Sequence, residues 1–229
     1  MSQLALPLQL ADHAVFASFY DRGNEPLVAT LRRITADDEQ FGCWLWGMPA
    51  TGKTHLLQAV CDASGDRAVY VPLQFFAAAG PGILEGLESR EIICLDDLDV
   101  VAGDVDWETA LFELLNQVFD AGGQVVAAAS SAPRESAIAL PDLASRLSRL
   151  PVFQLQPLDD DALIGALQLR SRHRGLELPD ETAAFLLRRE RRDMASLYEV
   201  LDKLDREALR AKRRLTVPFV RSVLENDSG

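Results

Sequence analysis

One short segment constrains the fold of this chain more than any other part, because few backbones can wrap closely around a phosphate group. Residues 47–54 read GMPATGKT and match the pattern G-x-x-x-x-G-K-[ST] at every fixed position. The two glycines let the chain curl so that successive amide N–H groups point inward and form an anion-binding nest. An apolar strand candidate at 42–46 precedes the motif and helical spacing follows it, which is the order that this chemistry requires. The sequence therefore predicts a nucleotide-binding P-loop.

The motif assigns roles to its polar residues. The Lys53 ammonium is expected to reach the β- and γ-phosphates of ADP or ATP, and the Thr54 hydroxyl is expected to ligate Mg²⁺. The residues predicted to contact the nucleotide are Gly47, Pro49, Ala50, Thr51, Gly52, Lys53, Thr54 and His55.

A second motif places two carboxylates at the end of a predicted buried strand. Apolar residues at 92–95 are followed directly by Asp96 and Asp97. Because the carboxyl ends of parallel strands meet at one edge of a sheet, these acids are expected to lie beside the P-loop. We predict that Asp96 holds the Mg²⁺ shell and that Asp97 polarises the water that attacks the γ-phosphate.

Three polar residues that follow have more than one interpretation. The next apolar strand, 125–129, is expected between the P-loop and the acidic strand, which would place Ser130 near the γ-phosphate or the attacking water. A polar turn before Pro133 is the alternative. Arg146 and Arg149 are expected on one helix face, and an arginine at a subunit edge can complete a neighbour's phosphate site in trans. A surface salt bridge is the commoner role for such arginines.

Strand and helix patterns alternate through the first two thirds of the chain, which predicts an α/β fold with a parallel sheet. The strand candidates are 41–46, 68–72, 91–95, 124–129 and 152–155. After Pro157 only helical patterns remain, with helices expected after Asp159, from Asp180 to about Arg192, from Ala195 to about Arg213, and from Thr216. We therefore predict an extended tail over 1–12, a five-stranded nucleotide-binding core over 13–157 and a small all-helical lid domain over 158–229.

The net charge of −12 is unevenly distributed. Residues 1–157 hold 9 Lys and Arg against 21 Asp and Glu, whereas residues 158–229 hold 14 of each kind. Neither part has the positive charge of a nucleic-acid binder, so DNA contact is expected to be at most indirect or weak. Every apolar run is shorter than the roughly 18 residues of a membrane span, and the three cysteines lack C-x-x-C spacing. We expect a cytoplasmic protein with buried free thiols and no membrane contact.

These motifs together resemble the DnaA-like initiator branch of the AAA+ superfamily, over residues 14–225. The resemblance rests on the P-loop and its helix, the acid pair, the strand tip at 130–133 and the segment ASRL at 144–147. It implies an AAA+ P-loop NTPase core with a helical lid, ADP or ATP with Mg²⁺ as cofactors, and a capacity to form homo-oligomers. At 229 residues, we expect no room for the amino-terminal interaction domain and the helix-turn-helix domain of DnaA.

The amino-terminal tail combines an amide with apolar anchors on a segment stiffened by proline. These residues are Gln3, Leu4, Leu6, Pro7 and Leu8. The tail resembles the peptide by which bacterial replication proteins dock on the β sliding clamp, and a tail that packs on its own domain is the alternative. With an initiator-like ATPase behind it, the tail resembles the Hda family of DnaA homologues, as do segments 155–179 and 201–220.

The Hda resemblance implies a regulator that docks on the DNA-loaded clamp and stimulates hydrolysis of DnaA-bound ATP, with Arg146 acting in trans. A helicase loader of the same superfamily and a non-catalytic clamp-tethered adapter are the alternatives. Ala195 stands where AAA+ lids usually carry an arginine near the γ-phosphate, and Ser130 replaces a stronger polar group. These departures predict weak ATP hydrolysis by the chain itself. Phe16 to Tyr20 and the turn at Ala195 are candidates for the adenine pocket.

Overall fold

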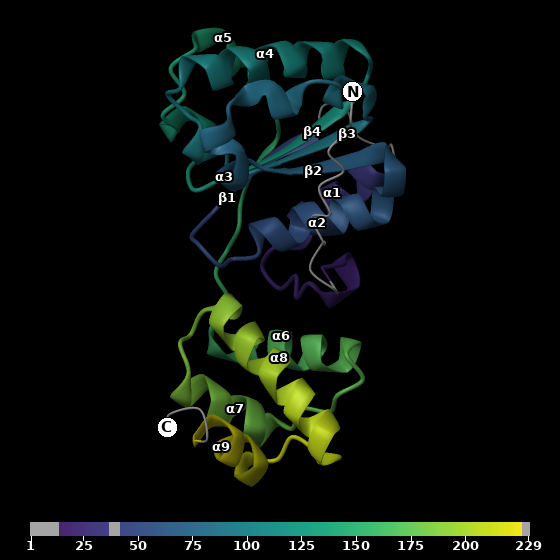
Figure 1. Cartoon of the computed structure of the whole chain (residues 1–229), viewed down its shortest axis with the longest axis vertical. Coiled ribbons are helices and arrows are strands. Elements are labelled where there is room, and N and C mark those ends of the chain that lie inside the picture. Colours follow the sequence, from purple (N-terminus) through teal and green to yellow (C-terminus); the bar gives the residue numbers. More distant parts are fainter. Residues whose placement is uncertain (1–13, 37–41, 226–229) are drawn as a thin grey trace.

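The computed structural model describes residues 14–36 and 42–225, which form an α/β part followed by an all-helical part (Figure 1). The strands are β1 (Gly42–Trp46), β2 (Ala68–Pro72), β3 (Ile92–Asp96), β4 (Gln124–Ala129) and β5 (Val152–Gln154). The α-helices around them are α1 (Glu25–Thr35), α2 (Lys53–Ser64), α3 (Leu73–Phe76), α4 (Val105–Asp120) and α5 (Pro141–Leu147). Short 3₁₀-helices connect these elements: η1 (Phe16–Ser18), η2 (Gly65–Arg67), η3 (Ala77–Ala79), η4 (Pro81–Leu84), η5 (Leu87–Ser89), η6 (Leu98–Val100) and η7 (Pro133–Glu135).

The sheet has five parallel strands in the order β2-β3-β4-β1-β5, which confirms the predicted architecture. β4 pairs with both β1, which leads into the P-loop, and β3, which ends at Asp96. The tip of β4 therefore lies between the P-loop and the acidic strand, as predicted. All strands end at the same edge of the sheet, and polar side chains from several of them can meet there.

Helices cover both faces of the sheet, so successive side chains of a strand enter different cores. On one face, Trp44 of β1 and Leu95 of β3 pack in a cluster with Trp107 of α4. On the other face, Leu45 packs with apolar residues of α1 and α2. Figure 1 shows α4 and α5 on one side of the sheet and α1 and α2 on the other. Burial on both faces explains why the inner strands β1, β3 and β4 are apolar at nearly every position.

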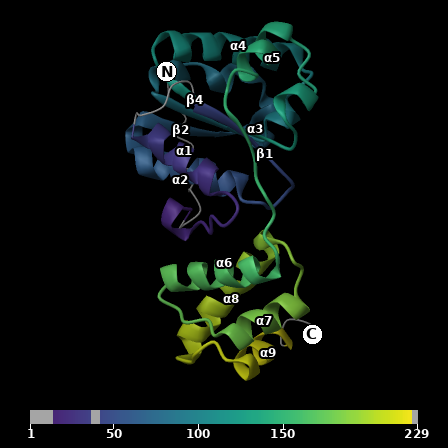
Figure 2. The ribbon, with the colours of Figure 1, turned by 180° about the vertical axis from the view of Figure 1, so that it is seen from behind.

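The helical part consists of α6 (Asp160–His173), α7 (Asp180–Arg189), α8 (Met194–Ala211) and α9 (Val217–Glu225). These helices enclose a third hydrophobic core, and Figure 2 shows the chain passing from the α/β part into α6. Two helices begin at aspartate caps, where Asp159 accepts the Ala162 N–H at 2.8 Å and Asp193 accepts the Ser196 N–H at 2.9 Å. In the described part of the chain, no helix combines the length and apolar character needed to cross a membrane.

Two predicted helix features differ from the structure. α7 ends at Arg189, short of the predicted end near Arg192, because the backbone becomes extended at Glu190 before Asp193 caps α8. α5 ends at Leu147, so Arg149 lies beyond it, and the prediction that Arg146 and Arg149 share a helix face was wrong. The chain has to leave the helix there in order to enter β5, which begins at Val152.

The helical part contacts the α/β part through the segment around η1. The Nε2 atom of His173 on α6 lies 2.6 Å from the carbonyl oxygen of Ala17. Gly165 of α6 faces the ring of Tyr20, and a Cβ at this position would lie 2.8 Å from the Tyr20 hydroxyl. α6 can therefore approach this segment closely only because residue 165 has no side chain.

Glu108 of α4 is a buried carboxylate that organises the loop before α5. It is 2% exposed and accepts hydrogen bonds from the N–H groups of Gly103 at 2.6 Å, Ala139 at 2.9 Å and Leu140 at 2.6 Å. Because these donors lie far apart in sequence, a single carboxylate connects the start of α4 to residues 139–140, which precede α5. Hydrogen bonds to a charged group are stronger than neutral ones, and an unsatisfied buried donor is costly.

We expect Glu108→Ala to lower the free energy of unfolding by about 3 kcal/mol, because three N–H groups would lose their charged acceptor. Chemical denaturation of both proteins measures this change. Glu113→Ala is the control, since Glu113 is an exposed residue on the same helix, and we expect a change within about 0.5 kcal/mol. Similar small changes in the two variants would contradict the role assigned to Glu108.

Candidate nucleotide-binding site

The P-loop connects β1 to α2 with a backbone that depends on glycine. Gly52 has a φ of 100°, in the left-handed region where a side chain is strained. A Cβ at this position would also lie 2.8 Å from the ring of Phe19. A Cβ at Gly47 would lie 3.1 Å from the carbonyl oxygen of Leu155. The loop is therefore packed tightly from both sides, which is the cradle that the motif predicts.

Lys53 begins α2, and its ammonium group lies across the P-loop. The Nζ atom donates hydrogen bonds to the carbonyl oxygens of Gly47 at 2.8 Å and Met48 at 3.1 Å. Burial lowers the pKa of Lys53, while nearby carboxylates, chiefly that of Asp96, oppose this shift. A partly buried cation at the amino end of a helix suits the binding of phosphate.

Thr54 and Asp96, the residues predicted to hold Mg²⁺, are in direct contact. The Thr54 hydroxyl donates to Oδ2 of Asp96 at 2.7 Å, and Asp96 is 1% exposed. These groups fit Mg²⁺, which prefers oxygen ligands and commonly takes its remaining ligands from phosphates and water. Within residues 14–36 and 42–225, no group of three or more His, Cys, Asp or Glu is arranged to hold a metal by itself.

Asp96 is oriented by two further hydrogen bonds. Tyr70 of β2 donates from its hydroxyl to Oδ2 at 2.8 Å, and the N–H of Asp97 donates to Oδ1 at 3.1 Å. Burial, together with the adjacent Asp96 carboxylate, raises the pKa of Tyr70 far above its ordinary value. Tyr70 therefore remains a donor and fixes the carboxylate beside Thr54.

Asp97 follows β3 with an unusual backbone conformation. Its φ of 56° and ψ of 47° are left-handed, which is costly for a residue other than glycine and is often found at functional sites. Burial raises the pKa of Asp97, the Asp96 carboxylate raises it further, and the Lys53 ammonium opposes the shift. A carboxylate whose proton affinity is raised in this way fits the predicted role of polarising water.

A cavity of about 480 Å³ lies between the P-loop and the helical part. Its α/β wall includes Pro49, Ala50, Gly52, Lys53, Thr54 and Asp97. Its helical wall includes Arg170 of α6 and, from the start of α8, Met194, Ala195 and Tyr198. The structure thus brings most of the predicted phosphate-binding residues to one cavity and adds a wall from the helical part. We name this space the P-loop cavity.

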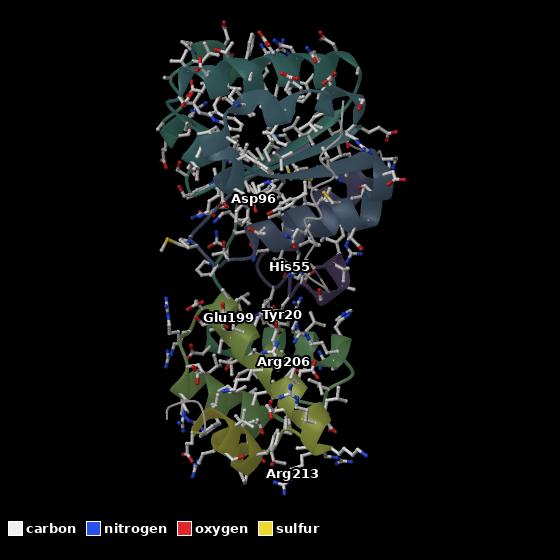
Figure 3. All side chains as sticks on the ribbon, in the orientation of Figure 1. Tyr20, His55, Asp96, Glu199, Arg206 and Arg213 are labelled. Carbon is white, nitrogen blue, oxygen red and sulfur yellow. The ribbon has the colours of Figure 1, made fainter. Side chains whose placement is uncertain are left out.

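A smaller cavity of about 50 Å³ adjoins the P-loop cavity, with Gly52, His55, Met194 and Tyr198 lining both. Its other walls are mainly apolar and aromatic and include Phe19, Tyr20, Leu158 and Ala166. In Figure 3, His55 and Tyr20 lie between the α/β part and the helical part, and Asp96 lies at the sheet. The adenine-pocket candidates are thereby separated, since Phe19 and Tyr20 line the smaller cavity and Ala195 lines the larger one.

His55 attaches the segment around η1 to the P-loop helix. Its Nε2 atom lies 3.0 Å from the carbonyl oxygen of Val15 and 3.4 Å from the Ser18 hydroxyl, and its ring meets that of Phe19 edge-on at 5.4 Å. Burial lowers the pKa of His55 to about 4, the Val15 carbonyl opposes this shift, and the Arg170 guanidinium adds to it. His55 is therefore neutral at pH 7 and acts as a packing and hydrogen-bonding residue.

This shift predicts a pH-dependent stability. Because the folded-state pKa is below the ordinary value, the unfolded chain takes up the proton first, and stability falls as the pH falls from about 6.5 toward 4. We expect the free energy of unfolding to drop by about 1 kcal/mol more in the unsubstituted protein than in His55→Gln between pH 7.5 and pH 5.5. Urea denaturation at both pH values measures it, and equal drops would contradict the assignment.

Ser130, Arg146 and Arg149 lie outside both cavities. Ser130 follows β4, and its N–H donates to Asp99 at 2.6 Å. Arg146 on α5 is partly exposed, and among the described residues its side chain has no ion-pair or hydrogen-bond partner. Arg149 is exposed. The predicted clamp-binding residues, Gln3 to Leu8, lie outside the described residues.

Ala195 lies where the missing lid arginine was predicted to matter, on the wall of the P-loop cavity. The neighbouring arginines do not replace it, because Arg191 pairs with Asp193 and Arg192 with Asp160, each at 3.2 Å. Sequence reasoning missed Arg170, which lines the cavity from α6, and Tyr70, which holds Asp96. Tyr70 could have been found by aligning β2 with β3, since it pairs with Cys94, whereas Arg170 gave no such signal.

The helical part matches a family model described as "Hda, lid domain" over residues 159–224. The helical part of the chain is therefore similar to the lid domain of Hda. The fold of the chain is shared with domain III of the replication initiation protein DnaA from Thermotoga maritima, at 22% identity and a TM-score of 0.73, covering 93% of this chain and 96% of that one. At such identity the likeness shows a common fold.

Two other solved structures share the fold of the chain. AMPPCP-bound DnaA from Aquifex aeolicus is 20% identical with a TM-score of 0.66, covering 79% of this chain and 61% of that one. RuvB of Thermotoga maritima, a Holliday junction branch migration motor, is 15% identical with a TM-score of 0.66, covering 92% of this chain and 72% of that one. The predicted AAA+ fold with a helical lid is confirmed.

Proposed function

We propose that the chain is an Hda-like protein that binds ADP or ATP with Mg²⁺ in the P-loop cavity and regulates the initiation of DNA replication. The observation that carries nucleotide binding is the convergence of Lys53, Thr54, Asp96 and Asp97 on one side of a tight glycine loop. Bound Mg²⁺ would neutralise charge on the phosphates. The adjoining apolar cavity, with Phe19 and Tyr20, suits the flat face of a base. The AMPPCP-bound DnaA neighbour supports the same ligand class.

The regulatory step that we propose is stimulation of ATP hydrolysis on DnaA, with Arg146 supplied in trans. Its guanidinium lies outside the chain's own P-loop cavity and has no partner among the described residues, so it is available to a neighbouring molecule. An arginine placed beside another protein's γ-phosphate stabilises the charge that develops during transfer. The Hda-type lid supports DnaA as that neighbour.

Docking on the β sliding clamp is proposed to bring the two proteins together on replicating DNA. The experiment that tests this function measures hydrolysis of DnaA-bound ATP in the presence of the Hda-like protein, the clamp and DNA, with each component omitted in turn. We expect full stimulation only in the complete mixture. Stimulation without the clamp would show that docking on the clamp is not required. No stimulation in any mixture would refute the proposed regulation of DnaA.

We expect simultaneous Gln3→Ala, Leu6→Ala and Leu8→Ala changes to abolish clamp binding without changing ADP affinity, because the amide and apolar anchors of the tail are not part of the P-loop motif or the acid pair. Co-elution with the clamp and titration with ADP measure the two properties separately. Ser2→Ala, which alters a tail residue outside the predicted motif, is the control. Retained clamp binding by the triple variant would place docking on another surface and favour a helicase loader.

A further inference from the structure

The helical wall of the P-loop cavity has one permanent cation among the described residues that line it. That cation is Arg170, near the end of α6. The start of α8, which faces the same cavity, contributes only uncharged side chains, Met194, Ala195 and Tyr198. On the opposite wall, Lys53 is the corresponding cation. The cavity is therefore flanked by two cations that come from different parts of the protein.

Arg170 is held in a defined place. The residue is 6% exposed, and its guanidinium carbon lies 4.8 Å from the centre of the Tyr198 ring. This stacking restricts the planar group beside the cavity that Arg170 lines. Arg170 and His55 of the P-loop helix line the same cavity. Burial is the main cause that lowers the pKa of Arg170, and an arginine remains charged under these conditions.

A buried cation beside a phosphate-binding loop is well placed for an anionic ligand. The P-loop offers amide N–H groups and the Lys53 ammonium from one side, and Arg170 faces the same space from the other. A guanidinium presents N–H donors in a rigid fork that matches phosphate oxygens. Its position on α6 differs from the position on α8 where the arginine of AAA+ lids was expected, and which Ala195 occupies.

We propose that Arg170 supplies the lid's contact with the phosphates of the bound nucleotide, so that α6 takes over a role for which α8 has only Ala195. This inference rests on the nucleotide binding proposed above. It makes Arg170 a determinant of affinity for the phosphate chain, distinct from the apolar cavity that would receive the base. Arg170 then belongs to the binding site although no sequence motif includes it.

The test compares affinities of the full chain for ADP, AMP and adenosine by calorimetry. We expect Arg170→Ala to weaken ADP binding by about 10- to 100-fold, as for loss of a charged hydrogen bond, and to change adenosine binding less than about twofold. Arg170→Lys should recover part of the ADP affinity. Arg174→Ala is the matched control, because Arg174 is a nearby lid arginine that pairs with Asp202 and does not line the cavity, and it should retain ADP affinity.

Two results would overturn the inference. Equal losses of adenosine and ADP affinity in Arg170→Ala would indicate that Arg170 only packs against Tyr198. Unchanged ADP affinity in this variant would exclude a phosphate contact. Arg170→Gln keeps a stem over Tyr198 without the charge, so it reports on the phosphate contact even where Arg170→Ala unfolds the lid. Lys53→Ala separates the two proposals, since a loss of ADP affinity there with none in Arg170→Gln refutes the role of Arg170 alone. Absence of ADP binding to the unsubstituted chain refutes both.

Discussion

Arg146→Ala is expected to remove the stimulation of DnaA-bound ATP hydrolysis, with a loss of about 10³-fold or more in the stimulated rate. The physical reason is that a guanidinium supplied in trans stabilises negative charge that develops on the transferred phosphoryl group. Binding of ADP and of the clamp should be unchanged, because Arg146 lines neither cavity. Single-turnover hydrolysis of labelled ATP preloaded on DnaA, with clamp and DNA present, measures the effect.

Arg149→Ala is the control for a general electrostatic effect. Arg149 is exposed and lies beyond the end of α5, whereas Arg146 is held on the last turn of that helix. The two residues are thus close in sequence but are presented differently, and we expect Arg149→Ala to retain most of the stimulation. Equal losses would indicate a diffuse positive surface. Normal stimulation by Arg146→Ala would refute the trans-acting mechanism.

Lys53→Ala is expected to weaken binding of ADP by about 100-fold or more, since the proposed contact of its ammonium group with two phosphates would contribute more than one charge-assisted hydrogen bond. The fold should persist, because Lys53 is the first residue of α2 and alanine is a favourable helix former. Calorimetric titration with ADP measures the affinity, and far-ultraviolet circular dichroism checks the fold. Unchanged affinity would remove the basis for assigning the P-loop cavity to a nucleotide.

Thr54→Val provides the matched control for this experiment. The substitution keeps the shape of the side chain but removes the hydroxyl that contacts Asp96 at 2.7 Å. We expect it to reduce ADP affinity when Mg²⁺ is present and to have little effect when Mg²⁺ is chelated, whereas Lys53→Ala acts in both conditions. A loss that is independent of Mg²⁺ in Thr54→Val would contradict the assignment of Thr54 to the metal.

Features that depend on neighbouring residues were predictable from the sequence. The P-loop requires glycine at fixed spacing for its backbone, so residues 47–54 can be recognised as a P-loop from their own sequence. The apolar runs at 68–72 and 124–129 coincide with β2 and β4. β4 is buried along its whole length, and a strand buried on both faces must be apolar throughout. The proximity of Asp96 to Thr54 was also predictable, since parallel strands end at one edge.

The sequence alone also carries the interpretation of the tail and of Arg146. The spacing of Gln3, Leu6 and Leu8 and the helix bearing Arg146 suggest partners, but the contacts involved belong to other molecules. For Arg146 the structure adds that the guanidinium has no partner among the described residues, and the experiments above decide the function.

Only the tertiary structure decided the contacts that join distant segments. Glu108 accepts hydrogen bonds from N–H groups that precede and follow α4 in the chain. Tyr70 of β2 donates to Asp96 of the neighbouring strand β3, and the partly buried His55 contacts the segment around η1. Arg170 reaches the P-loop cavity only because Gly165 lets α6 pack against Tyr20. Each of these side chains looks ordinary in its own stretch of sequence. The role of each side chain depends on which surface packs against it. Burial then determines its protonation state, its hydrogen-bond partners and its contribution to stability.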